Sequence, residues 1–484
     1  MIGIARLGGP IAVFGLALLL TGKTRRDRLA GLGFAAIGGC VLAAALAPDK
    51  PGEIVGGVFA ALAIAVVLAG VFRREPWLLP VAALASIPVR VGALGHQLLV
   101  PLYVVTLAAA VLLAWELVND ELRIRELGPV AWPLALFIGW TGLSLGWTKD
   151  VHEGATEMLA FYVPFAVLTV AIARLPWSRI GLRVLYVELT VMALVFAAVG
   201  FYQYQTRNVF ENPKVINSNA YAGFFRVNSV FWDPSVYGRF LVVAMVPTIV
   251  FIVRGRAQRL AWLGVGALVV TWLGLLISFS QSSFAALLVA VAGVAFVAWR
   301  WRALFAVALA VLVLGGLAAA QPQVRRSIQH HTSSGINSAT SGRSSLVANG
   351  IRIAAAHPAL GVGVGGFKHA YAARVKRLHG KRNLSTAASH DTPVTVAAET
   401  GLPGLALFAW LLLALGRVAF RSPRMISLIA GLSLAAILCH SLFYNDFFED
   451  PTTWLLIGLV AFARPPPVVV EQRVELPERE AVAA

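Results

Sequence analysis

The chain has 484 residues, of which 58% are hydrophobic and only 13% are charged, and its mean hydropathy is +0.78. Soluble globular proteins carry roughly 25% charged residues, so the composition excludes an ordinary soluble enzyme, a disulfide scaffold and a disordered protein. A helix needs about 20 apolar residues to cross a bilayer. We therefore predict an all-α polytopic membrane protein. The two cysteines, Cys40 and Cys439, lie in apolar stretches and read as packing residues.

In chain order, apolar runs predict about 15 transmembrane helices. The expected spans are 3–21, 29–47, 54–72, 77–95, 98–116, 129–147, 154–173, 184–203, 236–253, 260–277, 284–299, 303–321, 401–418, 425–442 and 451–463. The segment 465–484 opens with three prolines and is predicted to be a disordered cytoplasmic tail.

Basic residues concentrate in every second short loop, for example at 23–28, 73–74, 174–183, 254–259 and 417–424. The short loops between them are acidic or neutral, as at 49–53 and 150–153. Because loops rich in Lys and Arg stay in the cytoplasm, this alternation predicts an outside N-terminus and an inside C-terminus. Much of the formal charge of +17 is then topological and does not indicate nucleic-acid binding.

Two of the outward-facing loops are long, 204–235 and 322–400. The second contains ten Lys or Arg residues but only two Asp or Glu residues, a net charge of +8, and six of the nine histidines. Its patterns around 343–357 and 366–379 indicate helices. Attraction to anionic lipid headgroups is one explanation. The other is a site for an anionic substrate at the outer membrane surface.

Candidate chemical groups lie at this same predicted side of the membrane. A glycine-rich run, His357-Pro-Ala-Leu-Gly-Val-Gly-Val-Gly-Gly-Phe367, allows an unusual backbone path and the close approach of a ligand. His390, followed by Asp391, could accept a proton from a hydroxyl near neutral pH. Glu399 follows nine residues later and could face the same side.

Three further polar motifs belong to this side. Arg226 opens a loop that ends in Asp233-Pro234, and Arg239 lies at the start of the next span, where a charge is usually paired or functional. The serine-rich stretch 278–283 ends the tenth span, and His440-Ser-Leu-Phe-Tyr-Asn-Asp446 ends the fourteenth.

The order of these motifs resembles the bacterial O-antigen ligase and O-antigen polymerase superfamily. The matching elements run from the Arg226 loop through the serine-rich stretch, Arg343, the glycine-rich run, His390 and Glu399-Thr-Gly-Leu-Pro-Gly404 to the His440 motif. The family has a core of twelve helices with its large loop between the ninth and tenth. We therefore predict additional N-terminal membrane helices over 1–76, the core over 77–464, and a large, partly helical extracytoplasmic loop over 322–400.

The resemblance implies a membrane glycosyltransferase of the bacterial cytoplasmic membrane, with its site facing outside and no cofactor or metal. Its donor is a glycan on undecaprenyl pyrophosphate, and its acceptor is a hydroxyl of a glycan, lipid or protein. His390 is the implied base, and Arg226 and Arg343 the implied diphosphate ligands, with inversion at the anomeric carbon. Further substrate-binding candidates are Arg239, Gln281, Ser282, Arg352, Glu399 and Asp391.

The sequence departs from the family pattern at two positions. Gln281 stands roughly where many members have an arginine, and Asp391 stands where asparagine often follows the histidine. The motifs do not separate a ligase from a polymerase. A transporter or flippase of anionic lipid-linked glycans is the alternative, and a non-catalytic scaffold that binds membrane or cell-wall polymer through the basic loop is a third possibility.

Overall fold

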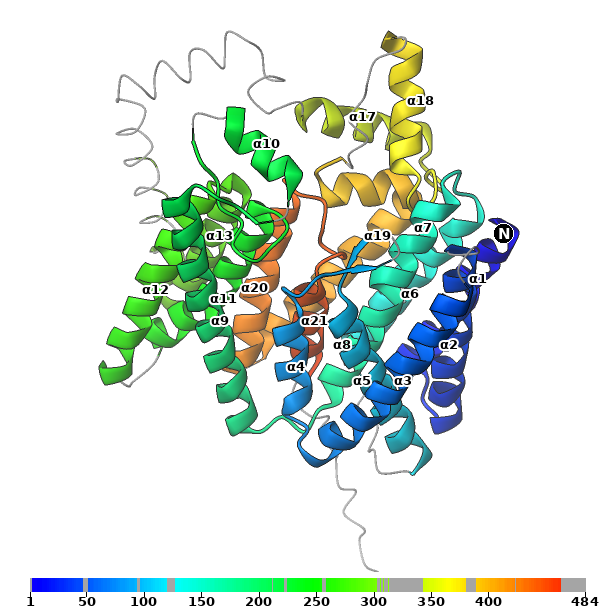
Figure 1. Ribbon diagram of the computed structural model, residues 1–484, viewed down its shortest axis with the longest axis horizontal. Coiled ribbons are helices and arrows are strands. Elements are labelled where there is room, and N and C mark those ends of the chain that lie inside the picture. Colours follow the sequence, from blue (N-terminus) through cyan, green and yellow to red (C-terminus); the bar gives the residue numbers. More distant parts are fainter. Residues whose placement is uncertain are drawn as a thin grey trace, which may run out of the picture.

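The computed structural model describes residues 2–46, 51–93, 96–119, 127–210, 212–221, 224–254, 258–302, 305, 308, 312, 343–379, 389–422 and 424–462. These residues are almost entirely helical (Figure 1). The first half contains α1 (Ile2–Thr21), α2 (Arg25–Leu46), α3 (Pro51–Arg74), α4 (Leu78–Ser86), α5 (Val100–Val118), η1 (Gly128–Val130), α6 (Ala131–Leu143), η2 (Ser144–Gly146), α7 (Val151–Glu157), η3 (Met158–Tyr162), α8 (Val163–Arg174), α9 (Arg179–Thr206) and α10 (Pro213–Tyr221). The second half contains α11 (Pro234–Arg254), α12 (Gln258–Ser278), α13 (Gln281–Trp299), α17 (Arg343–Ala356), α18 (Phe367–His379), α19 (Thr392–Arg421), α20 (Met425–Ser441) and α21 (Pro451–Phe462).

Eleven described helical segments are long and apolar enough to cross a membrane, which confirms the predicted polytopic membrane protein. They are Gly3–Thr21, Arg25–Leu46, Val55–Arg74, Val100–Val118, Gly128–Gly146, Val151–Arg174, Arg179–Thr206, Pro234–Arg254, Ala261–Ser278, Gln281–Trp299 and Thr392–Arg421. Helices α20 and α21 are shorter and apolar. The expected span 303–321 falls largely outside the described residues, as does the predicted tail 465–484.

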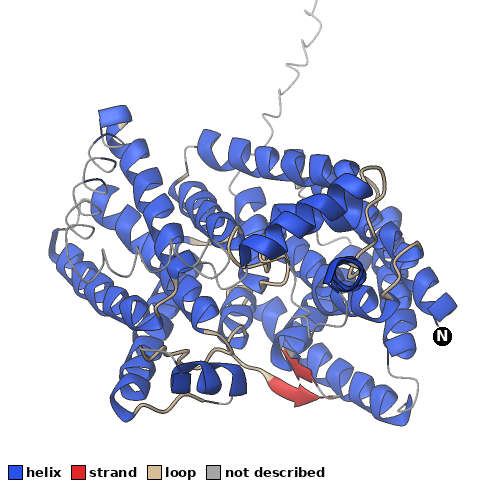
Figure 2. Cartoon of the chain, turned by 90° about the horizontal axis from the view of Figure 1, so that it is seen from above, coloured by secondary structure: helices blue, strands red, loops and turns tan. Residues whose placement is uncertain are grey.

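The expected fourth span, 77–95, is wrong as a single helix. Helix α4 ends at Ser86, and the chain continues into an antiparallel ribbon of β1 (Val91–Ala93) and β2 (His96–Leu98). Pro88 explains the break, because proline has no backbone N–H to donate and its ring clashes with the preceding helical turn. Figure 2 shows the ribbon at the edge of the helical bundle.

The three N-terminal helices pack against the rest of the bundle. Helix α1 contacts both α2 and α6, and α3 contacts α5. The contact between α1 and α2 is close because glycines face the opposite backbone: a Cβ on Gly15 would lie 2.3 Å from the Ala35 nitrogen, and one on Gly38 would lie 2.4 Å from the Ala12 nitrogen. Such small residues let membrane helices approach each other. The assignment of 1–76 as an addition to a family core stays a prediction.

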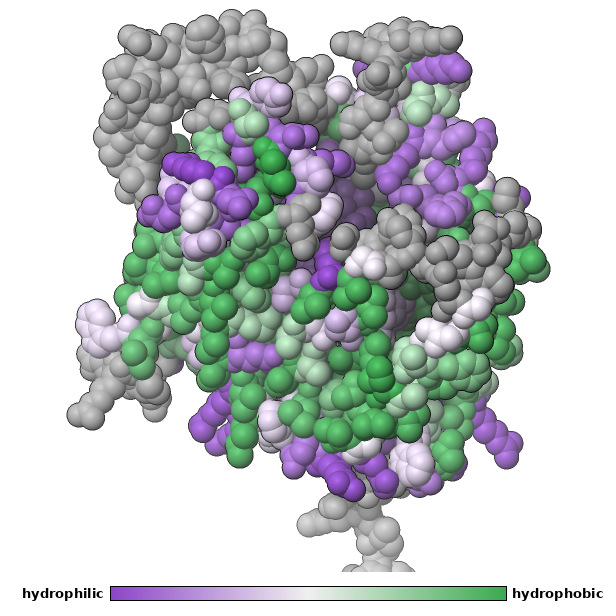
Figure 3. Space-filling model, in the orientation of Figure 1, coloured by the Kyte–Doolittle hydropathy of each residue, from purple (hydrophilic) through white to green (hydrophobic). Residues whose placement is uncertain are grey.

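Polar and charged residues concentrate at the two ends of the helical bundle. Helices α10, α17 and α18 lie at one end, which we call the loop end (Figure 1). Figure 3 shows an apolar belt across one face with hydrophilic residues above and below it. The helix termini opposite the loop end carry many arginines: Arg25, Arg28, Arg73, Arg74, Arg174, Arg179, Arg254, Arg300, Arg421 and Arg424.

A small second hydrophobic core lies at the loop end. Leu346 and Ile353 of α17 pack with Phe367 and Tyr371 of α18 and with Ala398 at the beginning of α19. The predicted helices in the long loop therefore form and are anchored on α19. This core also fixes the position of the glycine-rich run between α17 and α18.

Candidate functional site

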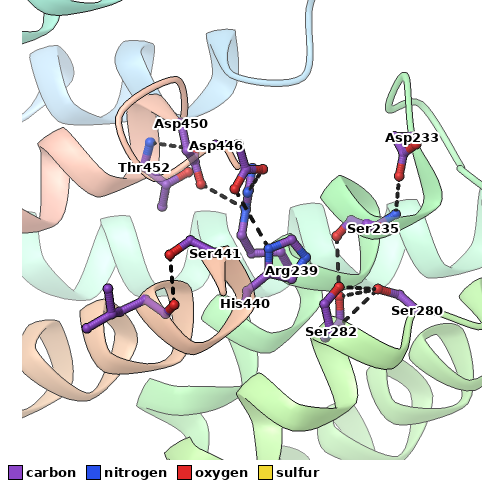
Figure 4. A network of polar contacts seen from close by, with 12 residues as sticks. Asp233, Ser235, Arg239, Ser280, Ser282, His440, Ser441, Asp446, Asp450 and Thr452 are labelled. Atoms are coloured by element: carbon purple, nitrogen blue, oxygen red, sulfur yellow. Dashed lines mark hydrogen bonds and ion pairs between the residues drawn. The ribbon is translucent and has the colours of Figure 1, made fainter. Parts of the chain in front are cut away.

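A buried ion-pair cluster lies at the loop end of α11, α20 and α21. Arg239 pairs with Asp446, and its Nε atom lies 2.9 Å from Asp450 Oδ2. The imidazole of His440 is fully buried, with Nδ1 3.8 Å from Asp446 Oδ1. Burial acts to raise the pKa of Asp446, but the charge of Arg239 and the neighbouring His440 outweigh it and lower that pKa below its ordinary value. Figure 4 shows the acidic groups converging on Arg239.

This cluster shows Arg239 paired within the protein, and the contact of Arg239 with substrate stays a prediction. Its guanidinium is almost fully buried and is held by two carboxylates. A buried charge requires such pairing because it has lost its hydration. The pairing joins α11 to the connection between α20 and α21, and it makes Arg239 an internal support of the site.

The serine-rich stretch closes the ends of two helices. Ser280 is the N-cap of α13, where its Oγ accepts from the Ser283 amide at 3.3 Å, and it lies 3.2 Å from the Ser282 hydroxyl. Ser283 Oγ donates to the carbonyl of Ser235 on α11 at 3.3 Å (Figure 4). Ser282 is buried in this network, whereas Gln281 is exposed at the start of α13. Of these two predicted substrate contacts, Gln281 has the more accessible side chain.

Arg226 is fixed in its loop by backbone contacts and by the end of α12. The side chain of Asn219 on α10 accepts from the Arg226 amide at 3.0 Å and donates to its carbonyl at 2.9 Å. The Nε–H of Arg226 donates to the Ser278 carbonyl at 3.2 Å. Further along the loop, Gln203 makes a similar pair of bonds to the backbone of Ser229. The loop is therefore held in one shape from both sides.

His390 lies immediately before α19 in an uncommon backbone conformation. Its φ is +60°, a region that residues other than glycine rarely occupy and that is often found at functional sites. Asp391 is the N-cap of α19 and accepts from the Val394 amide at 2.9 Å. The His390 ring lies 6.2 Å from the ring of Tyr444, centroid to centroid. The half-buried imidazole is thus presented beside the connection that also carries Asp446.

The glycine-rich run approaches protein backbone closely. Gly361, Gly363 and Gly365 all have positive φ, and a Cβ on Gly363 would lie 2.6 Å from Thr148 Cα. The amides of Val362 and Gly363 donate to the carbonyls of Ala398 and Glu399 at 2.9 and 2.8 Å. The unusual path expected from the sequence is present, and it serves to clamp this loop onto α19 and onto the chain just before α7.

Glu399 belongs to this clamp. Its Oε1 atom accepts from the Phe367 amide at 3.2 Å, which caps the first turn of α18. Gly401, two residues later, has φ +70° and kinks α19 where a Cβ would lie 2.8 Å from the Pro358 carbonyl oxygen. Glu399 is buried, so the capping contact accounts for its carboxylate, which was predicted to bind substrate.

The remaining basic candidates lie on α17 and α18. Arg343 is the first residue of α17, and Arg352 is exposed on the same helix. Lys368 of α18 pairs with Glu153 of α7, and although burial acts to lower its pKa, Glu153 raises that pKa above the ordinary value. Within the described ranges, no group of three or more His, Cys, Asp or Glu residues is arranged to hold a metal ion.

The structure therefore brings Arg226, Arg343 and His390 to the same end of the bundle. Sequence reasoning gave no role to Tyr444, Asp446 and Asp450, although the first two lie in the quoted His440 motif and Asp450 follows it four residues later. Their position within a single connection, at the outer end of an apolar run, was the available signal. What the sequence could not reveal is the partner, because Arg239 and His390 come from distant elements.

Comparison with known proteins gives a match over part of the chain. No curated protein matches the chain. Residues 266–409 match the family model of the O-antigen ligases, Wzy_C, and this range contains the second part of α12, all of α13, α17 and α18, the glycine-rich run, His390 and Glu399. The chain is thus a multi-pass membrane protein, and its residues 266–409 are similar to the O-antigen ligases.

Proposed function

We propose that the protein is a glycosyltransferase that moves a glycan from undecaprenyl pyrophosphate to an acceptor hydroxyl at the outer face of the bacterial cytoplasmic membrane. The family domain implies a glycan-transferring enzyme. The observation that carries the proposal is the placement of His390, in a strained backbone conformation, beside Tyr444 at the end of the bundle that also holds Arg226. An imidazole and guanidinium groups at one membrane surface suit proton removal and diphosphate binding.

In this reaction His390 accepts the proton of the acceptor hydroxyl as its oxygen forms a bond to the anomeric carbon. The bond from that carbon to the phosphate oxygen breaks, and undecaprenyl pyrophosphate leaves with the electron pair. Arg226 and Arg343 stabilise the negative charge that grows on the diphosphate. Attack from the opposite face inverts the anomeric carbon.

The arginine-rich ends of the helices support the orientation. Cytoplasmic loops carry the excess of Lys and Arg, so the opposite, loop end faces outward in this proposal. Charged residues of the described spans, such as Arg239 at the loop end and Arg254 at the opposite end of α11, lie near helix ends, which favours surface chemistry over a transport path through the membrane. Labelling of a cysteine introduced at exposed position Arg352 from outside intact cells tests this orientation.

The transfer assay tests the reaction. Purified protein in proteoliposomes is given an undecaprenyl-pyrophosphate oligosaccharide and an acceptor glycan, and the product is followed by mass spectrometry. Arg226→Ala is expected to slow transfer at least about a hundredfold, because charge stabilisation by one preorganised group is worth roughly that much. Arg254→Ala, an exposed arginine at the opposite end of α11, is the control. Equal transfer by wild type and Arg226→Ala would remove the basis of the proposal.

A further inference from the structure

The ring of Tyr444 lies close to two histidines that come from different parts of the chain. Its ring centroid is 6.2 Å from that of His390, which precedes α19, and 5.8 Å from that of His440, which lies in the last turn of α20. Tyr444 and His390 are half-buried, whereas His440 is fully buried. The phenol is therefore more accessible than His440 and lies beside the half-buried His390.

The connection that carries Tyr444 is rigidly held. Asp446 and Asp450 are both paired with Arg239, and the Asp450 amide donates to the Asp446 carbonyl at 3.0 Å. Phe448 is buried in an aromatic layer, and its carbonyl accepts from the Trp454 indole at 2.8 Å. These contacts leave Tyr444 little freedom to move away from His390, which is what a preorganised substrate contact requires.

The protonation state of the Tyr444 hydroxyl follows from its burial and from the neighbouring charges. Burial, and then the charges of Asp233 and Asp446, raise the pKa of Tyr444 above its ordinary value, so it is a neutral hydrogen-bond donor at physiological pH. Among the residues that the structure describes, this hydroxyl has no hydrogen-bond partner. Arg90, which is exposed just before β1, acts electrostatically on Tyr444 as well and adds positive charge to the surroundings.

We propose that Tyr444 is a further catalytic residue, whose hydroxyl donates a hydrogen bond to a non-bridging oxygen of the donor's diphosphate while His390 acts on the acceptor. This inference rests on the proposed function. A phosphate oxygen is the partner that fits, because a neutral donor bonds most strongly to an ionised acceptor and Arg90 attracts an anion to the same place. The contact strengthens as charge builds on the leaving diphosphate.

The experiment compares Tyr444→Phe with wild type in two measurements: glycan transfer, and the Kd for undecaprenyl pyrophosphate, the leaving product that carries the full charge. The phenylalanine keeps the ring close to the histidines and removes only the donor. Loss of a hydrogen bond to a charged group predicts roughly tenfold or greater weakening of both. Tyr371→Phe, a change in the small core between α17 and α18, is the matched control and is expected to leave both values unchanged.

The outcomes separate this inference from the proposed function. Slower transfer with an unchanged Kd for undecaprenyl pyrophosphate would overturn the diphosphate contact. Wild-type values in both measurements for Tyr444→Phe, with both lost in Arg226→Ala, would overturn the role of Tyr444 alone. If wild type binds undecaprenyl pyrophosphate no better than undecaprenol and Arg226→Ala transfers normally, the proposed function itself fails. Equal thermal unfolding of Tyr444→Phe and wild type shows that the fold is intact.

Discussion

Arg239 of α11 lies with its Nε atom 2.9 Å from an oxygen of Asp450, which directly precedes α21. Together with the pair to Asp446, this contact holds the connection between α20 and α21 against α11. The connection carries Tyr444, so one buried arginine supports the group beside His390.

Removing that arginine should destabilise the whole bundle. Arg239→Ala leaves two buried carboxylates without their counter-ion, and breaking a buried pair in this way costs about 3–5 kcal/mol. We expect a large fall in the temperature of unfolding in detergent, measured by intrinsic fluorescence. Arg254→Ala, exposed at the other end of α11, should leave it nearly unchanged. Equal stability of the two variants would contradict the structural role.

The glycine clamp predicts a second loss of stability. At Gly363 the φ of +87° strains any other residue, and the Cβ of Gly363→Ala would lie 2.6 Å from Thr148 Cα. We expect destabilisation of at least about 1–3 kcal/mol from the backbone alone. Gly139→Ala in α6, where a Cβ meets open space, is the control and should not destabilise. Thermal unfolding of the two variants measures the difference; a stable Gly363→Ala protein would show that the clamp is loose.

Two substitutions of Glu399 distinguish a capping role of its carboxylate from a role in substrate binding. Glu399→Gln keeps an oxygen that can accept from the Phe367 amide, whereas Glu399→Ala removes it. Loss of a cap costs about 0.5–2 kcal/mol, so the alanine variant should be less stable and the glutamine variant close to wild type. Normal stability of Glu399→Gln combined with abolished glycan transfer would instead assign the carboxylate to the substrate.

The pH dependence of stability tests Asp391. Burial raises the pKa of this half-buried carboxyl above its ordinary value of 3.8, so the ionised form is disfavoured in the folded state. Asp391→Asn keeps a side-chain oxygen for the Val394 amide and removes the charge. It should therefore match or exceed wild-type stability at pH 7. Asp391→Ala should lose about 1 kcal/mol with the cap.

The sign of the effect follows from proton binding. Between the unfolded pKa and the raised folded pKa, the folded state binds more protons than the unfolded one, so wild type gains stability as pH falls through that window. The advantage of Asp391→Asn should thus shrink between pH 7 and about pH 4. An advantage that grows on acidification would mean that the folded protein favours the ionised carboxylate.

The sequence predicted the membrane-spanning helices because long apolar runs have few alternatives in a bilayer. It failed over 77–95, where the hydropathy is continuous but Pro88 interrupts the helix and a ribbon follows. Contacts between residues far apart in the sequence could not be predicted either. The residues around Arg239 in the sequence do not indicate that Asp450 is its partner. The glycine-rich run indicates a close contact, but its sequence does not tell whether that contact is with a ligand or with Thr148.

The most direct test of the account is the rate of glycan transfer by His390→Ala in proteoliposomes, measured together with the Kd for undecaprenyl pyrophosphate. General base catalysis by a positioned side chain contributes about 10²–10⁴-fold. We predict that transfer falls by at least about a hundredfold while the affinity for undecaprenyl pyrophosphate is retained, since His390 acts on the acceptor. Transfer at the wild-type rate would contradict the claim that this imidazole removes the acceptor's proton.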